Sequence, residues 1–290
     1  MNSTRPIQFS IPEEKIVTEI PCKDFSFAPL IPSQLSTYIY NSEGSYYRDY
    51  QRSYYAVTCR KGGWDCLRHY EILANGCIPY FVNLPKCPPK TLTFFPKELV
   101  LEGMNMAGIS YPEIDFQQFD TSKYKKIVAE LLEFTRKHLT TKKIAQYLLE
   151  ELQYSKSGTI LYLSGELYPN YLHNLTLIGL KQLLGPRVVD FPKVEHLYNS
   201  YSKPIDSLYG KGFTYSKIID DEPVDREQIE TRIQKREFDL VIYGDIHRGS
   251  PYYYYVRRYY QPEQIVFLCG KDTHTCQPLP NLFIRESDSF

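Results

Sequence analysis

Two cations and a carboxylate lie close together in the segment that spans residues 60–81. Arg60 and Lys61 precede a pair of glycines, and Glu71 follows within a predicted helix. Free N–H groups at the start of a helix attract anions, and neighbouring cations strengthen that attraction. The segment therefore suits a diphosphate, and the carboxylate of Glu71 could accept hydrogen bonds from a ribose diol.

Charged residues recur at every third position of this helix, at Asp65, Arg68 and Glu71. At about 100° per residue, they lie within about 120° of one another around the helix. Arg68 could reach a phosphate or pair with its helical neighbours, and Asp65 could be the N-cap. An ordinary exposed face with ion pairs explains the same spacing, so spacing alone leaves both interpretations open.

A strand, a helix and a second strand must position these side chains. β-branched and aromatic residues at 53–60 predict a strand that ends before the two glycines. Apolar spacing predicts a helix over 65–75, which Gly76 ends, and a short buried strand over 77–82. The pattern is that of one Rossmann-like β-α-β unit.

Residues 65–79 resemble the donor-site motif of exostosin-type glycosyltransferases, D-x-x-R-x-x-E-x-L-x-x-G-C-I-P. More broadly, they are similar to the E-A-x-x-x-G-x-P-V block of GT-B enzymes that use nucleotide sugars. The matching positions are Asp65, Arg68, Glu71, Leu73, Gly76, Cys77, Ile78 and Pro79.

The resemblance implies a donor-binding role for this segment. Glu71 would bind the nucleotide ribose, and Arg60 and Lys61 would bind the diphosphate. Three further residues are expected in the same donor site: Gly63, Asp65 and Arg68. Many GT-B enzymes carry a second glutamate where this chain has Gly63, so the chain departs from that variant, and the contacts to base and sugar stay open.

The rest of the chain continues the alternation of helices and strands. Two amphipathic helices are predicted over 122–138 and 141–153, before a linker near residue 155. Continuous apolar runs in the second half are typical of parallel strands that are buried on both faces. The second half is predicted to contain a helix over 170–184 and strands over 158–165, 187–191, 238–245, 264–270 and 281–286.

These elements predict an α/β protein of GT-B-like architecture, with two Rossmann-like domains that face a cleft. Residues 1–155 are expected to bind the nucleotide-sugar donor and residues 156–290 the acceptor, with terminal segments that can cross between the halves. The donor-binding half of a GT-B enzyme usually comes second. A circular permutation would explain the order found here, and an exchange of roles between the halves is the alternative.

Candidate catalytic groups stand where strands of the second half end, because open α/β sheets bind ligands at the C-terminal ends of their strands. Asp245 is the first candidate for the general base of an inverting sugar transfer, and Glu166 is the second. His247 is an alternative base, because its ordinary pKa lies near neutrality. Arg248 could hold the acceptor or the diphosphate. Each of these residues could instead cap a strand or form a turn, as could the strand-end cluster at 271–274.

Tyrosine is unusually frequent, with 27 residues against 15 Phe and one Trp. The densest run, residues 252–260, follows the predicted strand that ends at Asp245. Tyr252 and Tyr253 are therefore predicted to contact the acceptor as a sugar-stacking platform. The alternative is helix packing, with the phenol edges reaching water.

Composition and missing motifs argue against several other classes. Lys plus Arg and Asp plus Glu both number 34, and a net charge of zero argues against a nucleic-acid-binding protein. The chain has no GxSxG, GxxxxGK[ST], complete GxGxxG or DxD motif. Its seven cysteines form no CxxC pair and are expected to be free, mostly buried thiols, so a structural zinc site is not predicted. Without a DxD motif, the sugar transfer is expected to need no metal, and no cofactor is predicted besides the nucleotide sugar as co-substrate. No apolar run approaches the roughly 18–20 residues of a membrane span, so a cytoplasmic protein is expected.

The sequence thus predicts a glycosyltransferase that moves a sugar from a UDP- or GDP-linked donor to a glycan hydroxyl, independently of a metal. Inversion of the sugar is what the exostosin-type resemblance implies. A non-catalytic module that binds glycans or nucleotides is one alternative. A different Rossmann-type transferase, such as a methyltransferase, is another.

Overall fold

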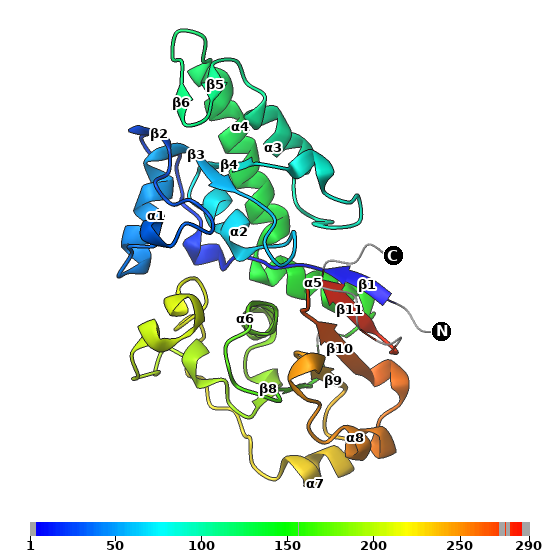
Figure 1. Ribbon diagram of the computed structural model, residues 1–290. Helices are drawn as coiled ribbons and strands as arrows, with labels where there is room; N and C mark the ends of the chain where they lie inside the picture. Colours follow the sequence, from blue (N-terminus) through cyan, green and yellow to red (C-terminus); the bar gives the residue numbers. More distant parts are fainter. Residues whose placement is uncertain (1–3, 156, 273–275, 277–278, 286–290) are drawn as a thin grey trace.

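A six-stranded parallel sheet forms the larger layer of the protein (Figure 1). The computed structural model describes residues 4–155, 157–272, 276 and 279–285. Along the sheet the strands follow the order β1-β11-β10-β9-β7-β8, and this sheet with its helices confirms the predicted α/β class. The strands are β1 (Thr4–Ile7), β7 (Ile160–Leu163), β8 (Val188–Phe191), β9 (Leu240–Tyr243), β10 (Ile265–Cys269) and β11 (Leu282–Arg285).

The strand order is that of a doubly wound sheet. Counted from β7, the strands β8-β7-β9-β10-β11 have the order 2-1-3-4-5, and β7 and β9 flank the point where the winding reverses. β1 adds to the outer edge of β11, in a register that pairs Thr4 with Leu282 and Ile7 with Arg285. The first strand of the chain therefore lies in a sheet whose other strands all come from the second half.

Side chains along the strands alternate between the two faces of this sheet. Ile160 and Tyr162 of β7 pack on one face, whereas Leu161 and Leu163 pack on the other. Both faces are buried, which explains the continuous apolar runs of the strands. Helices α5 (Thr141–Glu151) and α6 (Tyr171–Leu184) contribute to the first core, and α7 (Ile229–Gln234) and α8 (Tyr253–Tyr259) cover the second.

The contact between α5 and α6 depends on Gly179. A Cβ atom at this position would overlap the carbonyl oxygen of Thr141 and lie 2.9 Å from the Cβ atom of Ala145. Because the overlapped atom belongs to the backbone, Gly179→Ala is expected to lower the free energy of unfolding by about 1–3 kcal/mol. Urea denaturation measures this change.

Gly44→Ala is the matched control for that substitution. Gly44 lies in the first turn of α1 (Glu43–Gln51), and an added Cβ atom there would have no neighbour within 4 Å. This variant is expected to be as stable as the wild type or slightly more so, because alanine favours the helix. Equal stability of the Gly179→Ala and Gly44→Ala variants would contradict the close approach of α5 and α6.

A three-stranded parallel sheet with its own helices forms the second layer, drawn above the larger sheet in Figure 1. Its strand order is β2-β3-β4. Tyrosines of α1 pack near Ala56 on one face of β3, and α4 packs near Tyr55 on the other. The remaining elements are β2 (Phe25–Phe27), β3 (Ser53–Thr58), α2 (Leu67–Ala74), β4 (Ile78–Phe81), α3 (Lys97–Met104), β5 (Ile109–Ser110), β6 (Glu113–Ile114) and α4 (Thr121–Phe134).

Helix α2 begins two residues later and ends one residue earlier than the predicted range of 65–75. Gly76 follows the helix with a positive φ of 64°, as a C-terminal glycine does. The residue at the N-cap position is Cys66, so the prediction of Asp65 as N-cap is wrong. The carboxylate of Asp65 instead accepts hydrogen bonds from the Phe9 N–H group at 2.8 Å and the Tyr70 hydroxyl at 2.7 Å.

Arg285, at the end of β11, links the two layers. Its Nη1 atom donates a hydrogen bond to the carbonyl oxygen of Asp65 at 2.8 Å and lies 3.7 Å from the Asp65 carboxylate. Its Nη2 atom pairs with Asp272, whose carboxylate also lies beside Gly62. The loop after β3 therefore faces the C-terminal ends of β10 and β11. In the described part of the chain, no helix is long and apolar enough to cross a bilayer.

Candidate functional site

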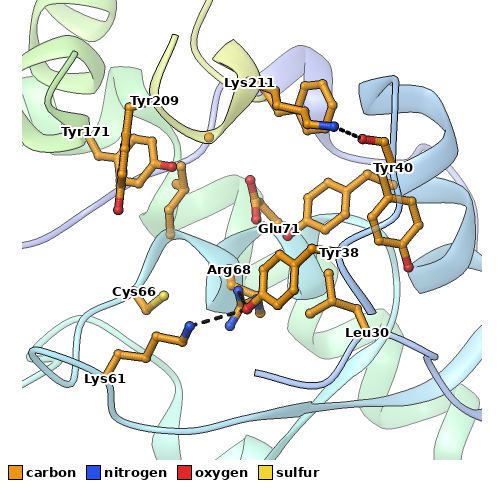
Figure 2. Close-up of a pocket in the computed structure, with 14 residues that line it drawn as sticks. Leu30, Tyr38, Tyr40, Lys61, Cys66, Arg68, Glu71, Tyr171, Tyr209 and Lys211 are labelled. Carbon is orange, nitrogen blue, oxygen red and sulfur yellow. Dashed lines mark hydrogen bonds between the residues drawn. The ribbon is translucent and has the colours of Figure 1, made fainter. Parts of the chain in front are cut away.

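A pocket lies between the loop after β3, helix α2 and the segment around residue 211. Its volume is about 320 Å³, at the small end of the roughly 300–1,000 Å³ range of ligand pockets. Figure 2 shows Lys61 and Arg68 on one side and Tyr171, Tyr209 and Lys211 on the other. The remaining lining residues are Leu30, Tyr38, Tyr40, Tyr46, Cys66, Leu67, Glu71, Gly210 and Phe213.

The guanidinium group of Arg68 is only partly satisfied. Its Nη2 atom donates a hydrogen bond to the hydroxyl of Tyr38 at 2.8 Å. Its Nε and Nη1 atoms are buried and have no hydrogen-bond partner among the described residues. A buried donor without a hydrogen-bond partner destabilises the folded protein, and a buried cation does so more strongly. The two nitrogens therefore favour an anion in the pocket.

Two lysines add positive charge to the same pocket. Lys61 donates a hydrogen bond to the Tyr38 hydroxyl at 3.3 Å, so this phenol lies between Lys61 and Arg68. Lys211 reaches from the other side and donates a hydrogen bond to the carbonyl oxygen of Tyr40. Three cations thus surround a space lined with tyrosines, which is a suitable environment for phosphate next to an aromatic group.

Glu71 contributes a buried carboxylate to the pocket. Its Oε2 atom accepts a hydrogen bond from the Tyr46 hydroxyl at 2.6 Å, and its Oε1 atom accepts one from Thr214. Burial raises the pKa of Glu71, while these two hydrogen bonds and the charge of Arg68 oppose the shift. A carboxylate has about four lone-pair sites, so two remain for a ligand.

The burial of Glu71 predicts a pH-dependent difference in stability. Because the folded protein has the higher pKa, the stabilisation that protonation of Glu71 provides is complete below pH 4.5 and is lost as the pH rises through the raised pKa. Glutamine stays neutral at every pH. The free energy of unfolding of Glu71→Gln, relative to that of the wild type, is therefore expected to increase between pH 4.5 and about pH 8. Urea denaturation at both pH values measures the increase.

Glu14→Gln is the matched control, because the side chain of Glu14 is exposed. The difference between this variant and the wild type is expected to be the same at both pH values. A Glu71→Gln variant that loses stability relative to the wild type as the pH rises would show that the buried carboxylate is preferred in its charged form.

The catalytic candidates gather at the C-terminal ends of β7 and β9. Asp245 accepts hydrogen bonds from the His247 N–H group at 3.0 Å and from the side-chain amide of Asn170 at 2.7 Å. Arg248 Nε lies 3.4 Å from the Asp245 carboxylate, and Arg248 Nη1 lies 3.9 Å from Glu166. The structure therefore brings all four predicted residues together at the topological switch point of the sheet.

This strand-end cluster lies next to the pocket without lining it. Its two loops are in backbone contact, because the Glu166 N–H group donates to the carbonyl oxygen of Arg248 at 2.9 Å. The Arg248 guanidinium lies 5.2 Å from the ring centre of Tyr168, which in turn lies 6.4 Å from the ring centre of Tyr209 in the pocket. Two tyrosine rings thus separate the cluster from the pocket.

His247 has a second set of neighbours. Its Nε2 atom lies 3.1 Å from the sulfur of Cys269 and 3.3 Å from that of Cys276. Burial, followed by the charge of Lys271, lowers the pKa of His247. Cys269 and Cys276 form a disulfide, so the prediction that all seven cysteines are free is wrong. Of the free cysteines, Cys77 is buried, Cys22 is exposed and the others are half-buried.

The six predicted donor-binding residues divide into two groups. Lys61, Arg68 and Glu71 line the pocket. Arg60 packs 5.8 Å from the ring centre of Trp64. The carbonyl oxygen of Gly63 accepts a hydrogen bond from the backbone of Lys61 at 3.0 Å. Neither Arg60 nor Gly63 lines the pocket, and Asp65 points towards Arg285.

The predicted acceptor tyrosines pack beside the second core of the larger sheet. The ring centre of Tyr252 lies 6.2 Å from that of Phe191, and the ring centre of Tyr253 lies 5.9 Å from that of Phe267. Neither residue lines the pocket, and their contact with an acceptor stays a prediction. In the 271–274 cluster, Thr273 and His274 lie outside the described residues.

Several residues of the site carry no motif that sequence reasoning identified. Tyr38, Lys211 and Thr214 come from loops and short 3-10 turns outside α2. The G-K-G sequence at 210–212 is a signal for one of these segments, because glycine-rich loops that carry a lysine often hold phosphate. Gly210 and Lys211 both have a positive φ, at 61° and 56°.

No family model, curated protein or solved structure matches this chain.

Proposed function

We propose that the protein is a glycosyltransferase and that its pocket binds the diphosphate of a nucleotide-sugar donor. The observation that carries this proposal is the pair of buried Arg68 nitrogens beside Lys61 that have no hydrogen-bond partner in the described part of the chain. The Nε and Nη1 donors lie on different edges of the guanidinium group, so they suit oxygens of the two phosphates of a diphosphate. The pocket thus offers one anion a specific set of hydrogen bonds.

The nucleoside part of the donor would lie against the aromatic and acidic side of the pocket. The remaining lone pairs of Glu71 can accept hydrogen bonds from the ribose hydroxyls. Tyr38 and Tyr209 offer ring faces for the base, since both line the pocket and are partly exposed. Glu71 and Arg68 lie on one face of α2, so a single ligand can contact both.

In the proposed reaction, the acceptor oxygen forms a bond to the anomeric carbon as the bond to the diphosphate breaks. Lys61, Arg68 and Lys211 would stabilise the charge that develops on the departing diphosphate. Asp245 would take the proton from the acceptor hydroxyl. The acceptor would lie along Tyr168, which connects Arg248 to Tyr209.

The arrangement of the two sheets supports a GT-B-like interpretation with permuted halves. The loop after β3 faces the C-terminal ends of β10 and β11, and the Asp65–Arg285 contact joins them. Strand β1 extends the larger sheet next to β11, so the first and last strands of the chain are neighbours in one sheet. Both features are those expected of two facing sheets in a permuted chain.

A non-catalytic nucleotide-binding module is the second candidate. Two observations on Asp245 favour it. Both carboxylate oxygens of Asp245 already accept hydrogen bonds, and Asp245 does not line the pocket. The pocket could therefore bind a nucleotide with no base in reach of an acceptor.

Calorimetry with UDP, GDP, CDP and S-adenosylhomocysteine tests the proposed ligand class. Binding of at least one nucleoside diphosphate, and not of the S-adenosyl compound, is expected. Slow release of free sugar and nucleoside diphosphate from the matching nucleotide sugar would then indicate the enzyme. Tight binding without any such release would favour the binding module, and binding of the S-adenosyl compound alone would contradict both.

A further inference from the structure

We propose that His247, Cys269 and Cys276 form a binding site for Zn²⁺ when the two cysteines are reduced. Their ligand atoms all lie within 4.8 Å of one another. The imidazole Nε2 atom is 3.1 Å from one sulfur and 3.3 Å from the other. This site is independent of the nucleotide pocket and does not rest on the proposed function.

The donor set is one that zinc prefers. Two thiolates and one imidazole, completed by water, form one of the known three-ligand zinc sites. Bond lengths of about 2.3 Å to sulfur and 2.0–2.1 Å to nitrogen place tetrahedral ligands roughly 3.6 Å apart. The two nitrogen–sulfur distances are close to that value, so His247 needs little movement. Among the described residues, no fourth His, Cys, Asp or Glu joins this group.

The backbone leaves room for a metal between the cysteines. Their Cα atoms lie 7.1 Å apart, which exceeds the 4.4–6.8 Å of most disulfides. Two thiolates on one zinc ion are separated by roughly 3.8 Å, and this wider span suits a longer Cα distance. The sulfurs can separate to that distance by side-chain rotation after the bond between them is reduced.

Two of the three ligands lie at the C-terminal ends of neighbouring strands of the larger sheet. Cys269 is the last residue of β10 and is buried, at 1% exposure. His247 lies in the short 3-10 turn that follows β9, the neighbouring strand. Cys276 is half-buried in the connection from β10 to β11. The site therefore stands at the C-terminal edge of a parallel sheet, where such folds place their ligands.

Metal binding requires a defined change in the cysteines. Two small-molecule thiols deliver two electrons and two protons to the Cys269–Cys276 disulfide and are themselves joined as a disulfide. Zn²⁺ then binds to the two thiolates and to the neutral imidazole of His247, and the two thiol protons are released. The oxidised protein lacks both thiolates, so binding is limited to the reduced form.

Titration of the full chain with Co²⁺ tests this site, because thiolate ligation of Co²⁺ gives a strong near-ultraviolet charge-transfer absorption. The protein is reduced with a phosphine, freed of metal, and compared with an oxidised sample. The reduced protein is expected to show two more reactive thiols than the oxidised protein. It is also expected to bind one equivalent of Co²⁺ with the thiolate absorption, which Zn²⁺ then abolishes by displacement.

Three variants complete the test. Cys276→Ser is expected to lose the charge-transfer absorption, and His247→Gln to weaken Co²⁺ binding about tenfold or more. Cys22→Ser, which changes an exposed cysteine elsewhere, should bind Co²⁺ as the wild type does. Circular dichroism melting shows whether each variant is folded.

Three results would overturn the proposal. The first is a reduced, folded wild type without thiolate absorption. The second is an absorption that persists in Cys276→Ser or disappears in Cys22→Ser. The third is a cysteine pair that stays oxidised under the phosphine.

Discussion

Replacement of Arg68 by glutamine is expected to weaken the binding of nucleoside diphosphates roughly 100-fold. Two charge-assisted hydrogen bonds from Nε and Nη1 would be lost, each worth about 1.5–3 kcal/mol. Their sum of at least about 3 kcal/mol corresponds to a factor of slightly more than 100 in the dissociation constant. Calorimetric titration of the Arg68→Gln variant with UDP or GDP measures the effect.

Two controls distinguish lost phosphate contacts from a damaged pocket. Arg52→Gln removes an exposed arginine that pairs with Asp24 away from the pocket, and it should bind nucleotides like the wild type. Unphosphorylated uridine or guanosine should bind equally to Arg68→Gln and to the wild type. An unchanged affinity of Arg68→Gln for the diphosphate would show that Arg68 does not contact it.

Asp245→Asn is expected to slow sugar transfer by about 10²–10⁴-fold, because an amide cannot act as the general base. The dissociation constant of the nucleoside diphosphate should stay the same, since Asp245 does not line the pocket. Steady-state rates with nucleotide sugar and acceptor, together with calorimetry on the same variant, measure the two quantities.

Glu166→Gln is the matched control for the base. The side chain of Glu166 is 75% exposed, and its contact with Arg248 is loose at 3.9 Å. Its loss should change the transfer rate much less than Asp245→Asn does. If Glu166→Gln abolished transfer while Asp245→Asn, confirmed as folded, kept it, then the roles of the two carboxylates would have to be exchanged.

Local patterns were sufficient to predict four of the eight α-helices and seven of the eleven strands in the described part of the chain. The helix predicted over 170–184 is α6, and the strand predicted over 264–270 contains β10. Alternation, apolar runs and helix-ending glycines are local signals, because each depends on a few neighbouring residues. Helix α4 ends earlier than predicted, at Phe134, where a π-helical turn over residues 135–139 takes its place.

The site could be predicted only where its residues share one segment. Lys61, Arg68 and Glu71 were found because they lie around one helix start. The contacts of Asp65 do not follow from its neighbours in the sequence, because its partners Phe9 and Arg285 are 56 and 220 residues away in the chain. The same limit applies to Tyr38 and the 209–214 segment, which join the pocket through tertiary contacts alone.

Hydrogen bonds from buried hydroxyl groups explain part of the excess of tyrosine. Tyr46 donates to Glu71, and Tyr50 donates to Tyr46 at 2.9 Å. Tyr55 and Tyr124 donate to backbone carbonyl oxygens. Phenylalanine could fill these positions but would remove these hydrogen bonds. Composition alone showed the excess, and the contacts show that much of it serves the core.

A crystal structure of the protein with a bound nucleoside diphosphate tests the central claim most directly. We expect phosphate oxygens within about 3 Å of Arg68 Nε and Nη1, with Lys61 beside them and the ribose hydroxyls on Glu71. A nucleotide bound elsewhere, with the Arg68 pocket unchanged and empty, would contradict the assignment of this pocket as the donor site.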